Sequence, residues 1–209
     1  TRTDTLFPYT TLFRSLQERV RAHFEESIAT KRQTVEVLAE PTAEAAMMLI
    51  ECLMNDGKIL VCGNGGSAAD AQHFAAELTG RFEKERMELA AIALTTDTSA
   101  LTAIGNDYGF EHIFSKQVRA LGRPGDVLLG ISTSGNSGNV IEAIKAAHER
   151  DMRILAFTGR DGGKIAAMLK DNDILLNVPH PRTARIQENH IVLVHALCDC
   201  IDTVLMEGM

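Results

Sequence analysis

Residues 63–81 have the sequence Gly-Asn-Gly-Gly-Ser-Ala-Ala-Asp-Ala-Gln-His-Phe-Ala-Ala-Glu-Leu-Thr-Gly-Arg, and this stretch decides the fold. The apolar run 58–62 before it predicts a buried strand, the glycines predict a sharp turn, and Ser67 is a good helix N-cap. Backbone N–H groups in such a turn, with no Cβ to block approach, can bind an anion or a sugar hydroxyl. The stretch therefore predicts a binding turn between a strand and a helix, although an isolated Gly-Asn-Gly-Gly sequence is also typical of a plain loop.

Two residues of the predicted helix carry possible chemistry. His73 and Glu77 are four positions apart, so their side chains leave the same helix face. An imidazole beside a carboxylate can bind a metal ion or transfer a proton. A solvated surface pair would have the same spacing, and the rest of the chain has to decide between the two interpretations.

The composition indicates one globular domain, with 209 residues of which 45% are hydrophobic and 23% charged. A net charge of -7, without a Lys/Arg-rich run, argues against direct nucleic-acid binding. No stretch approaches the apolar length that spans a bilayer, so we expect no membrane association. The cysteines show neither zinc-knuckle nor Cys-x-x-Cys spacing, which indicates reduced packing residues in a cytoplasmic protein. They are Cys52, Cys62, Cys198 and Cys200.

Residues 1–15 do not belong with the rest of the chain, because they lack an initiator Met and show no helical period. The stretch resembles a translated sequencing-adapter read. A targeting peptide is the alternative, but the stretch has no continuous apolar core followed by a small-residue cleavage pattern. We expect a non-native or disordered leader, followed by a single domain at residues 16–209.

Helical and apolar segments alternate through the rest of the chain. Two helices are expected before the first strand, one over residues 16–38 and one opened by Pro41, either as an oligomer interface or packed on the sheet. Continuous apolar runs separated by helices then predict a parallel sheet covered on both sides. Besides 58–62, these runs are 89–94, 126–131, 153–158 and 174–178, and the last helix is expected over 183–206.

A second polar turn comes after the run 126–131. Residues 132–137, Ser-Thr-Ser-Gly-Asn-Ser, lead into a helix, and their hydroxyls with the free N–H groups of its first turn could surround a phosphate without a lysine. The Gly-Lys-Ser/Thr ending of a nucleotide P-loop is absent. A Ser/Gly turn is often only a cap, but ligands of open α/β sheets bind outside the carboxyl ends of the strands. Two such turns in one sheet therefore favour phosphate binding.

The last predicted helix carries further candidates. Gln187 and His195 are eight positions apart, about 80° around the axis, and so lie roughly on one side. Glu188 fits that side slightly better, and periodicity alone cannot choose between it and Gln187. His190 and His195 could each be a satisfied core or surface histidine.

Together these segments resemble a known family. Gly-Asn-Gly-Gly-Ser, His-Phe-Ala-Ala-Glu-Leu, Gly-Asn-Asp, Gly-Ile-Ser-Thr-Ser-Gly-Asn-Ser and Arg-Ile-Gln-Glu-Asn-His occur in the order and spacing of phosphoheptose isomerases, which are SIS-type sugar isomerases. The resemblance covers residues 16–205. It implies a flavodoxin-like αβα sandwich with a five-stranded parallel sheet, a homotetramer, and conversion of sedoheptulose 7-phosphate into D-glycero-D-manno-heptose 7-phosphate, the first step toward the ADP-heptose of lipopolysaccharide.

The resemblance also implies roles for single residues. Glu77 and His195 are implied as the acid/base pair, which suits a reaction that moves a carbonyl between C2 and C1. One Zn²⁺ per subunit is implied, and this selects Gln187 over Glu188 by resemblance only. The implied zinc ligands are His73, Glu77, Gln187 and His195. The implied substrate contacts are Asn64, Gly65, Gly66, Ser67, Glu77, Asn106, Asp107, Ser132, Thr133, Ser134, Ser137 and Gln187. Ala184 stands where some members carry Asp, which puts a substrate contact at that point in doubt.

Two alternatives come from other functional classes. The chain also resembles a replication-initiator-associating protein, a tetrameric binding module whose branch lacks the acid/base glutamate and histidine. Because Glu77 and His195 are both present, we expect an enzyme, with a replication-initiator partner left open. A phosphosugar-sensing SIS protein would carry a DNA-binding or other module, for which this length leaves no room.

Overall fold

The centre of the fold is a sheet of five parallel strands in the order β2-β1-β3-β4-β5. The structure is a computed structural model that describes residues 7–207. The strands are β1 (Ile59–Gly63), β2 (Ala91–Ala93), β3 (Val127–Ile131), β4 (Arg153–Gly159) and β5 (Ile174–Val178). The chain moves outward from β1 to β2 and then crosses back to β3 on the other side. The point where the strand order reverses therefore lies between β1 and β3, which is where such sheets bind ligands.

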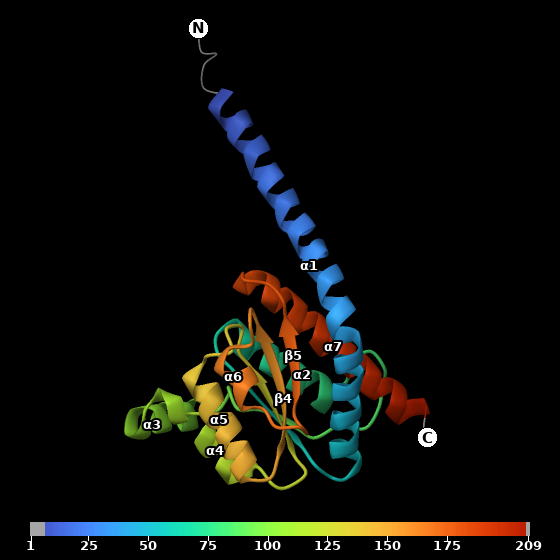
Figure 1. Cartoon of the computed structure of the whole chain (residues 1–209), viewed down its shortest axis with the longest axis vertical. Helices are drawn as coiled ribbons and strands as arrows, with labels where there is room; N and C mark the ends of the chain where they lie inside the picture. The colour runs from blue at the N-terminus through green and yellow to red at the C-terminus, as the bar shows by residue number, and fades with distance from the viewer. Residues whose placement is uncertain (1–6, 208–209) are drawn as a thin grey trace.

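Helices cover both faces of this sheet (Figure 1). They are α1 (Phe7–Met54), α2 (Gly66–Thr79), α3 (Thr98–Tyr108), α4 (Ser115–Leu121), α5 (Gly138–Glu149), α6 (Gly163–Met168) and α7 (Thr183–Glu207), with a 3₁₀ turn η1 (Phe110–His112). The expected αβα sandwich with a five-stranded parallel sheet is confirmed.

Each strand contributes to two cores because successive side chains point to opposite faces. Ile59 and Val61 of β1 are fully buried among side chains of α1, α2 and α7. Leu60 and Cys62 are fully buried on the other face, among side chains of α4 and α5. This two-sided burial explains why the strands are continuous apolar runs rather than alternating ones.

The N-terminal part is one helix, and the expectation of two helices is wrong. Pro41 lies inside α1, where it removes one main-chain hydrogen bond without ending the helix. Leu38, Ala45 and Leu49 are all buried in the same core on either side of the proline. Their spacing of seven and four positions is that of one continuous helix face, and the burial of that face holds the helix together across Pro41.

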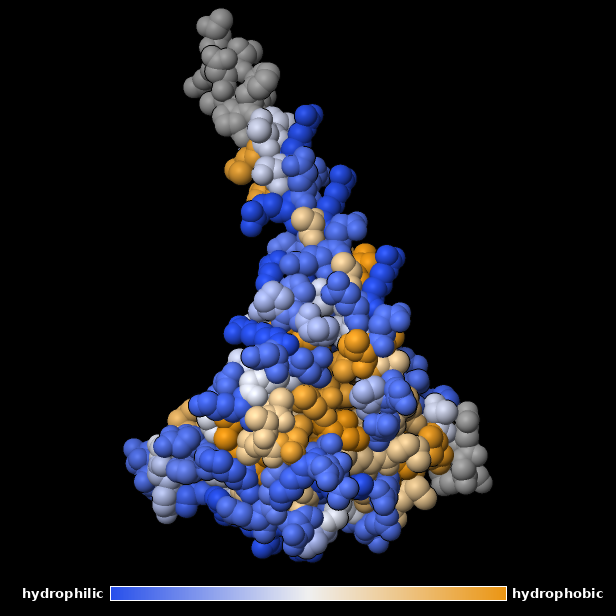
Figure 2. All heavy atoms as spheres, viewed as in Figure 1, coloured by the Kyte–Doolittle hydropathy of each residue, from blue (hydrophilic) through white to orange (hydrophobic). Residues whose placement is uncertain are grey.

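The first half of α1 extends from the body as a rod (Figure 1). Residues 7–15, for which no helical period was expected, form its first turns, while residues 1–6 lie outside the described residues. Tyr9, Leu12 and Phe13 are more than half exposed. Figure 2 shows a mostly polar rod above a continuous apolar area where α1 enters the body.

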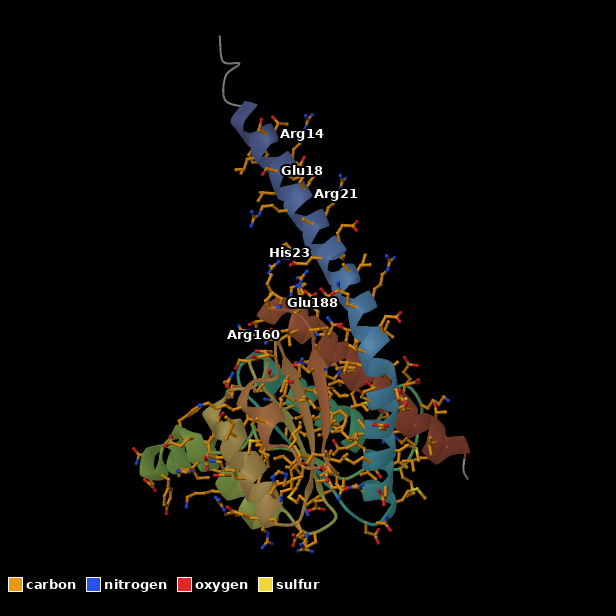
Figure 3. All side chains as sticks on the ribbon, in the orientation of Figure 1. Arg14, Glu18, Arg21, His23, Arg160 and Glu188 are labelled. Carbon is orange, nitrogen blue, oxygen red and sulfur yellow. The ribbon has the colours of Figure 1, made fainter. Side chains whose placement is uncertain are left out.

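Ion pairs attach the middle of α1 to the start of α7. Arg185, only 3% exposed at its side chain, donates hydrogen bonds to the main-chain carbonyl of His23 and to the Glu188 carboxylate. Arg182 pairs with Glu26 in the same cluster. Figure 3 shows His23 and Glu188 facing one another across this junction, while Arg14, Glu18 and Arg21 lie further out on the rod. The rod is therefore fixed to the body from about His23 onward.

Helix α7 is, by length and composition alone, able to cross a membrane. The expectation that no stretch reaches that length is wrong for residues 183–206. Ile186, Val194, Leu197 and Ile201 of this helix are, however, fully buried in the core shared with α1 and α2. The core helix of a folded domain passes the same test of length and composition, so α7 is weak support for a membrane span.

The four cysteines are free thiols. Burial raises the pKa of Cys62 to about 12, and burial together with the nearby Glu77 carboxylate raises that of Cys198 to about 12. Thiols with such pKa values are protonated at neutral pH and therefore unreactive. Their burial agrees with the packing role that the sequence predicts.

We predict that residues 1–15 are dispensable for folding. Deleting them should leave the melting temperature unchanged, because the described part of this stretch is exposed and the attachment to α7 begins near His23. A longer deletion, of residues 1–29, is the control. It removes the partners of buried Arg185 in α1 and should cost about 1–3 kcal/mol of unfolding free energy. Equal losses for the two deletions in urea unfolding would show that the leader belongs to the fold.

Candidate active site

The turns after β1 and β3 lie side by side because these strands are paired in parallel, with Gly63 opposite Ile131. Asn64 follows β1, and Asn139 lies in the first turn of α5. Their side-chain amides form two reciprocal hydrogen bonds of 2.8 Å, and Asn139 is only 3% exposed. This amide pair joins the two turns that the sequence singles out.

The glycines of the first turn have two separate uses. Gly65 has a φ of 56°, in the region that favours glycine, and forms the N-cap of α2. A Cβ at Gly66 would collide with the side-chain amide of Gln187 from α7, so this position lets Gln187 approach the turn. The expectation that Ser67 caps the helix is wrong, because α2 begins at Gly66 and Ser67 is buried inside its first turn.

A cluster of titratable side chains lies between α2 and α7. His73 Nε2 is 2.8 Å from Glu77 Oε1 and 3.4 Å from His195 Nε2. The side chains of His73 and Glu77 are 39% and 22% exposed, so the cluster is partly buried but open to a ligand. Phe82, from the loop after α2, stacks on the His195 ring with centroids 5.8 Å apart. The structure thus brings together three of the four predicted zinc ligands, including both members of the predicted acid/base pair.

The structure shows different surroundings for Gln187 and Glu188, between which periodicity alone could not choose. Gln187 lies against Gly66, and therefore at the binding turn. Glu188 Oε1 instead accepts a hydrogen bond of 2.6 Å from Arg185 and belongs to the junction with α1. Of the two neighbours, only Gln187 is positioned to contact a ligand in the turn.

The second turn is compact and rich in hydroxyl groups. Ser132 Oγ lies 2.8 Å from Ser137 Oγ, and Ser134 Oγ accepts a hydrogen bond from the Asn136 N–H. Gly135 has a φ of 65°, and a Cβ there would collide with the main chain of Gly162. The turn ends at α5, whose first N–H groups have no partner within the helix. Hydroxyl and N–H donors therefore converge at the carboxyl end of β3, as phosphate binding requires.

Asn106 and Asp107 lie apart from this cluster. They are exposed near the end of α3, and the Asn106 amide donates a hydrogen bond of 2.8 Å to Asp107. Figure 1 shows α3 projecting from the side of the body. In residues 7–207, neither side chain forms a hydrogen bond with a predicted site residue other than its neighbour, so one chain does not bring these two into the site.

Comparison with known proteins supplies the family. Residues 22–159 match the SIS domain family. Over 195 residues the chain is 80% identical to the phosphoheptose isomerase of Neisseria gonorrhoeae, which covers 93% of this chain and 99% of that protein. The solved structure of a phosphoheptose isomerase from N. gonorrhoeae matches with a TM-score of 0.87 and 77% identity, over 90% of this chain and 100% of that one. A phosphoheptose isomerase from Francisella tularensis matches with the same TM-score at 48% identity, over 90% and 98% of the two chains.

The chain belongs to the phosphoheptose isomerase family. The resemblance found in the sequence motifs is therefore confirmed, and the chain is an enzyme of the sugar-phosphate isomerase class. In this phosphoheptose isomerase fold the α2–α7 cluster contributes titratable side chains, and the two joined turns contribute hydrogen-bond donors at the same edge of the sheet.

The donor chemistry of this phosphoheptose isomerase cluster fits a zinc ion. Zinc takes imidazole nitrogens and carboxylate oxygens, and tetrahedral Zn–N bonds place two ligand atoms about 3.3 Å apart. The two imidazole Nε2 atoms of His73 and His195 are 3.4 Å apart. Within the described chain, no group of three or more His, Cys, Asp or Glu side chains forms a metal site by itself. The four-donor set that the resemblance implies also includes the amide of Gln187, which lies against Gly66.

Sequence reasoning missed two residues of this site. Asn139 comes two positions after the second turn, so its polar side chain in a glycine-rich segment could have been identified as a site candidate from the sequence. Phe82 gave no signal, because its stacking on His195 depends on how the loop after α2 folds back. Both residues support side chains that the sequence identified.

The neighbouring His190 is a core residue. It is fully buried, and its Nε2 lies 2.9 Å from the main-chain carbonyl of Thr158. Burial lowers the pKa of His190 from 6.5 to about 4. His195, in contrast, is partly exposed. Of the two histidines whose roles the sequence left open, the structure makes His190 the packing residue.

We predict that His190 makes the fold acid-sensitive. Its pKa is lower in the folded than in the unfolded chain, so its contribution is present above pH 6.5 and is lost as pH falls toward 4. At pH 5 the loss is about 2 kcal/mol of unfolding free energy. Urea unfolding at pH 7.5 and pH 5 should show this loss for the parent chain and a smaller one for His190→Gln. The same pH dependence in both proteins would contradict the assignment.

Proposed function

We propose that the chain converts sedoheptulose 7-phosphate into D-glycero-D-manno-heptose 7-phosphate through an enediol, in the cytoplasm, as the first step toward the ADP-heptose of lipopolysaccharide. The observation that carries this proposal is the cluster of Glu77, His73 and His195 beside two joined binding turns. An aldose–ketose isomerase needs a base, an acid and a phosphate anchor, and this arrangement offers one of each.

The phosphate end of the substrate is assigned to residues 132–137. Donors there come from hydroxyl groups and from N–H groups at the start of α5, so a dianionic phosphate is held by hydrogen bonds and the helix dipole rather than by a lysine. The sugar chain then extends along the joined turns, past Asn64 and Gly66, toward α7. This path leads from the carboxyl end of β3 to that of β1.

Two side chains move the protons. The Glu77 carboxylate takes a proton from C1 of the ketose while His195 protonates the C2 oxygen, which gives the enediol. The C1 hydroxyl then returns its proton to His195, and Glu77 delivers a proton to C2, so the carbonyl has moved to C1. In the absence of a metal ion His73 holds Glu77 by their hydrogen bond, and Phe82 stacks on the His195 ring.

A zinc ion, one per subunit, is part of the proposal. His73, Glu77, Gln187 and His195 would hold it, because their donor types suit zinc and Gln187 lies near the turn beside the cluster. When bound, the ion would act as a Lewis acid toward the substrate oxygens. The proton transfers are assigned to this chain's own side chains.

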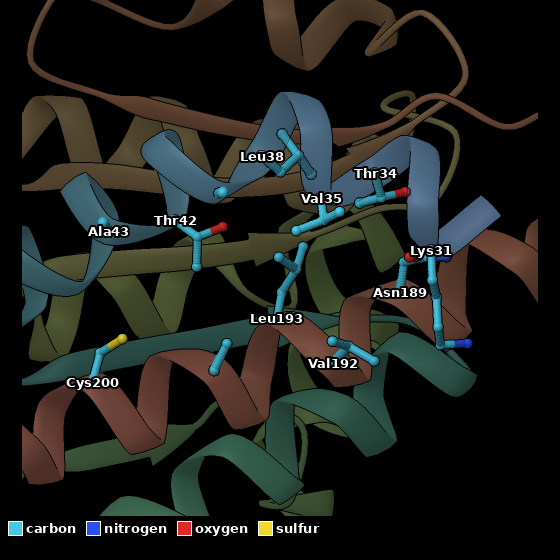
Figure 4. A pocket seen from close by; sticks show the side chains of 12 residues that line it. Lys31, Thr34, Val35, Leu38, Thr42, Ala43, Asn189, Val192, Leu193 and Cys200 are labelled. Atoms are coloured by element: carbon cyan, nitrogen blue, oxygen red, sulfur yellow. The ribbon is translucent and has the colours of Figure 1, made fainter. Parts of the chain in front are cut away.

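The working form is proposed to be a homotetramer. Leu16, Val20, Phe24 and Ile28 form an exposed apolar stripe along α1 at a spacing of four positions. Where α1 meets α7, a cavity of about 260 Å³ is lined mostly by apolar side chains such as Val35 and Val192, with polar side chains such as Lys31 and Asn189 among them (Figure 4). Apolar surface of this extent favours burial against other subunits. A second subunit could also contribute Asn106 and Asp107, which one chain leaves outside its own site.

We predict that replacing either member of the acid/base pair abolishes turnover with little effect on binding. Glu77→Gln should lower kcat at least about 10²-fold, because the base acts in the transition state, and His195→Gln should have a comparable effect. A coupled assay with sedoheptulose 7-phosphate, with zinc content measured in each variant, tests this. Near-parent kcat in either variant would show that the pair is wrongly assigned.

The matched control is Ser134→Ala with Ser137→Ala, which removes two hydroxyl donors from the phosphate turn. It should raise KM more than it lowers kcat, because the phosphate is bound in both ground and transition states. An unmodified, zinc-loaded protein that fails to isomerise the sugar phosphate, yet binds a replication initiator, would instead favour the binding-module function.

A further inference from the structure

Arg86 is a buried arginine in the loop between α2 and β2. Its side chain is 4% exposed and pairs with Asp202 of α7, which is equally buried, through an Nε–Oδ1 hydrogen bond of 2.6 Å. Its Nη2 donates to the main-chain carbonyl of Glu77 at 2.7 Å, and its Nη1 donates to that of Leu78 at 2.9 Å. One guanidinium therefore joins the end of α2 to the C-terminal part of α7.

The end of α2 needs such a partner. The last carbonyls of a helix have no partner within it, and a positive charge there is favourable for the helix dipole. Helix α2, described over its whole length, has no basic residue in its own last turn and is followed by the C-cap Gly80. Arg86 supplies the missing charge and donors from the loop after the helix. The planar guanidinium can serve a carboxylate and two carbonyls at once, which a lysine cannot.

The two helices that Arg86 joins carry the two members of the proposed acid/base pair. The main-chain carbonyl of Glu77 accepts a hydrogen bond from Arg86. His195 and Asp202 are seven positions apart on α7, so they lie on nearly the same helix face, about 10 Å apart along the axis. The distance between the Glu77 carboxylate and the His195 ring thus depends on how α2 is held against α7, and Arg86 holds them at the level of Glu77.

Arg86 also anchors the loop that supports His195. Its Nη1 donates to the carbonyl of Met87, which fixes the loop's return toward β2. Four positions earlier the same loop places Phe82 on the His195 ring, with an angle of 29° between the rings. Moving Arg86 would therefore shift the helix behind Glu77 and loosen the ring that packs on His195.

We propose that Arg86 is a positioning residue for the isomerisation, which it supports by holding Glu77 and His195 in their working geometry. The inference rests on the proposed roles of these two residues. Arg86 does not touch the reacting atoms in this assignment. Its effect is expected on kcat, because a displacement of about 1 Å in a catalytic group can cost about 10²-fold in rate.

The test separates positioning from folding. Arg86→Met alone leaves Asp202 as an unpaired buried charge and could fail to fold, so it is combined with Asp202→Leu, because replacing both members of a buried ion pair by apolar residues is often neutral for stability. The double variant should keep the parent melting temperature and oligomer mass. It should lose about 10- to 100-fold in kcat with KM changed less than about threefold, because the Glu77 carbonyl has lost its arginine donor and the Leu78 carbonyl keeps only the Leu89 N–H.

Two further variants sharpen the result. Arg86→Lys should restore only part of kcat, because a single ammonium cannot reach the carboxylate and both carbonyls. Arg153→Met is the matched control: Arg153 also joins a carboxylate to a helix carbonyl, those of Glu51 and Met48, but at the opposite end of the sheet. It should change stability and leave kcat at the parent value.

A kinetic coupling test links Arg86 to the proposed pair. If Arg86 acts through Glu77, adding the Arg86→Met/Asp202→Leu change to Glu77→Gln should cost little further rate. Parent-like kcat in a folded Arg86→Met/Asp202→Leu protein would overturn the positioning role. Full additivity with Glu77→Gln would also overturn it. A wrong assignment of the acid/base pair would give a different result from a wrong positioning role, because Glu77→Gln alone would then keep its turnover.

Discussion

The parallel pairing of β1 with β3 is the constraint on which the rest of the molecule depends. It aligns Gly63 with Ile131, so the two polar turns open at the same edge of the sheet, where the strand order reverses. The reciprocal amide bonds of Asn64 and Asn139 then fix one turn to the other. The two polar turns, to which phosphate and sugar binding are assigned, form one surface only because this pairing holds.

Helix α7 converts that surface into a reactive site. It carries Gln187 to the glycine turn, His195 to His73, whose ring contacts the Glu77 carboxylate, and Asp202 to Arg86. Its apolar face is buried against the sheet, α1 and α2, so the positions of these three side chains are set by core packing. The apolar residues of α7 that fill the core therefore also set the positions of the groups assigned to proton transfer.

Most of the fold could be predicted from sequence because its signals are local. Apolar runs of the right length mark the strands, and glycine and serine turns mark their ends. The break at Pro41 was wrongly predicted because the local rule for proline ignores Leu38, Ala45 and Leu49, which bury one continuous face.

Side chains whose role depends on distant contacts could not be predicted. Asn64 and Asn139 are 75 positions apart, and Arg86 and Asp202 are 116 apart, so only the folded chain shows that they are partners. The candidate residues His73, Glu77 and His195 were found because two of them share a helix face and all three match a family pattern. Asn106 and Asp107 matched the same pattern, but in a single chain they lie on the projecting helix α3.

Solvent exchange during the reaction tests the central claim, proton transfer through an enediol, most directly. The parent protein is brought to equilibrium with sedoheptulose 7-phosphate in D₂O, and deuterium at C2 of the aldose is measured by NMR and mass spectrometry. A carboxylate base such as Glu77 exchanges its proton with solvent between turnovers, so the account predicts that deuterium accumulates at C2. Full retention of protium after many turnovers would show direct hydride transfer between C1 and C2 and would contradict the account.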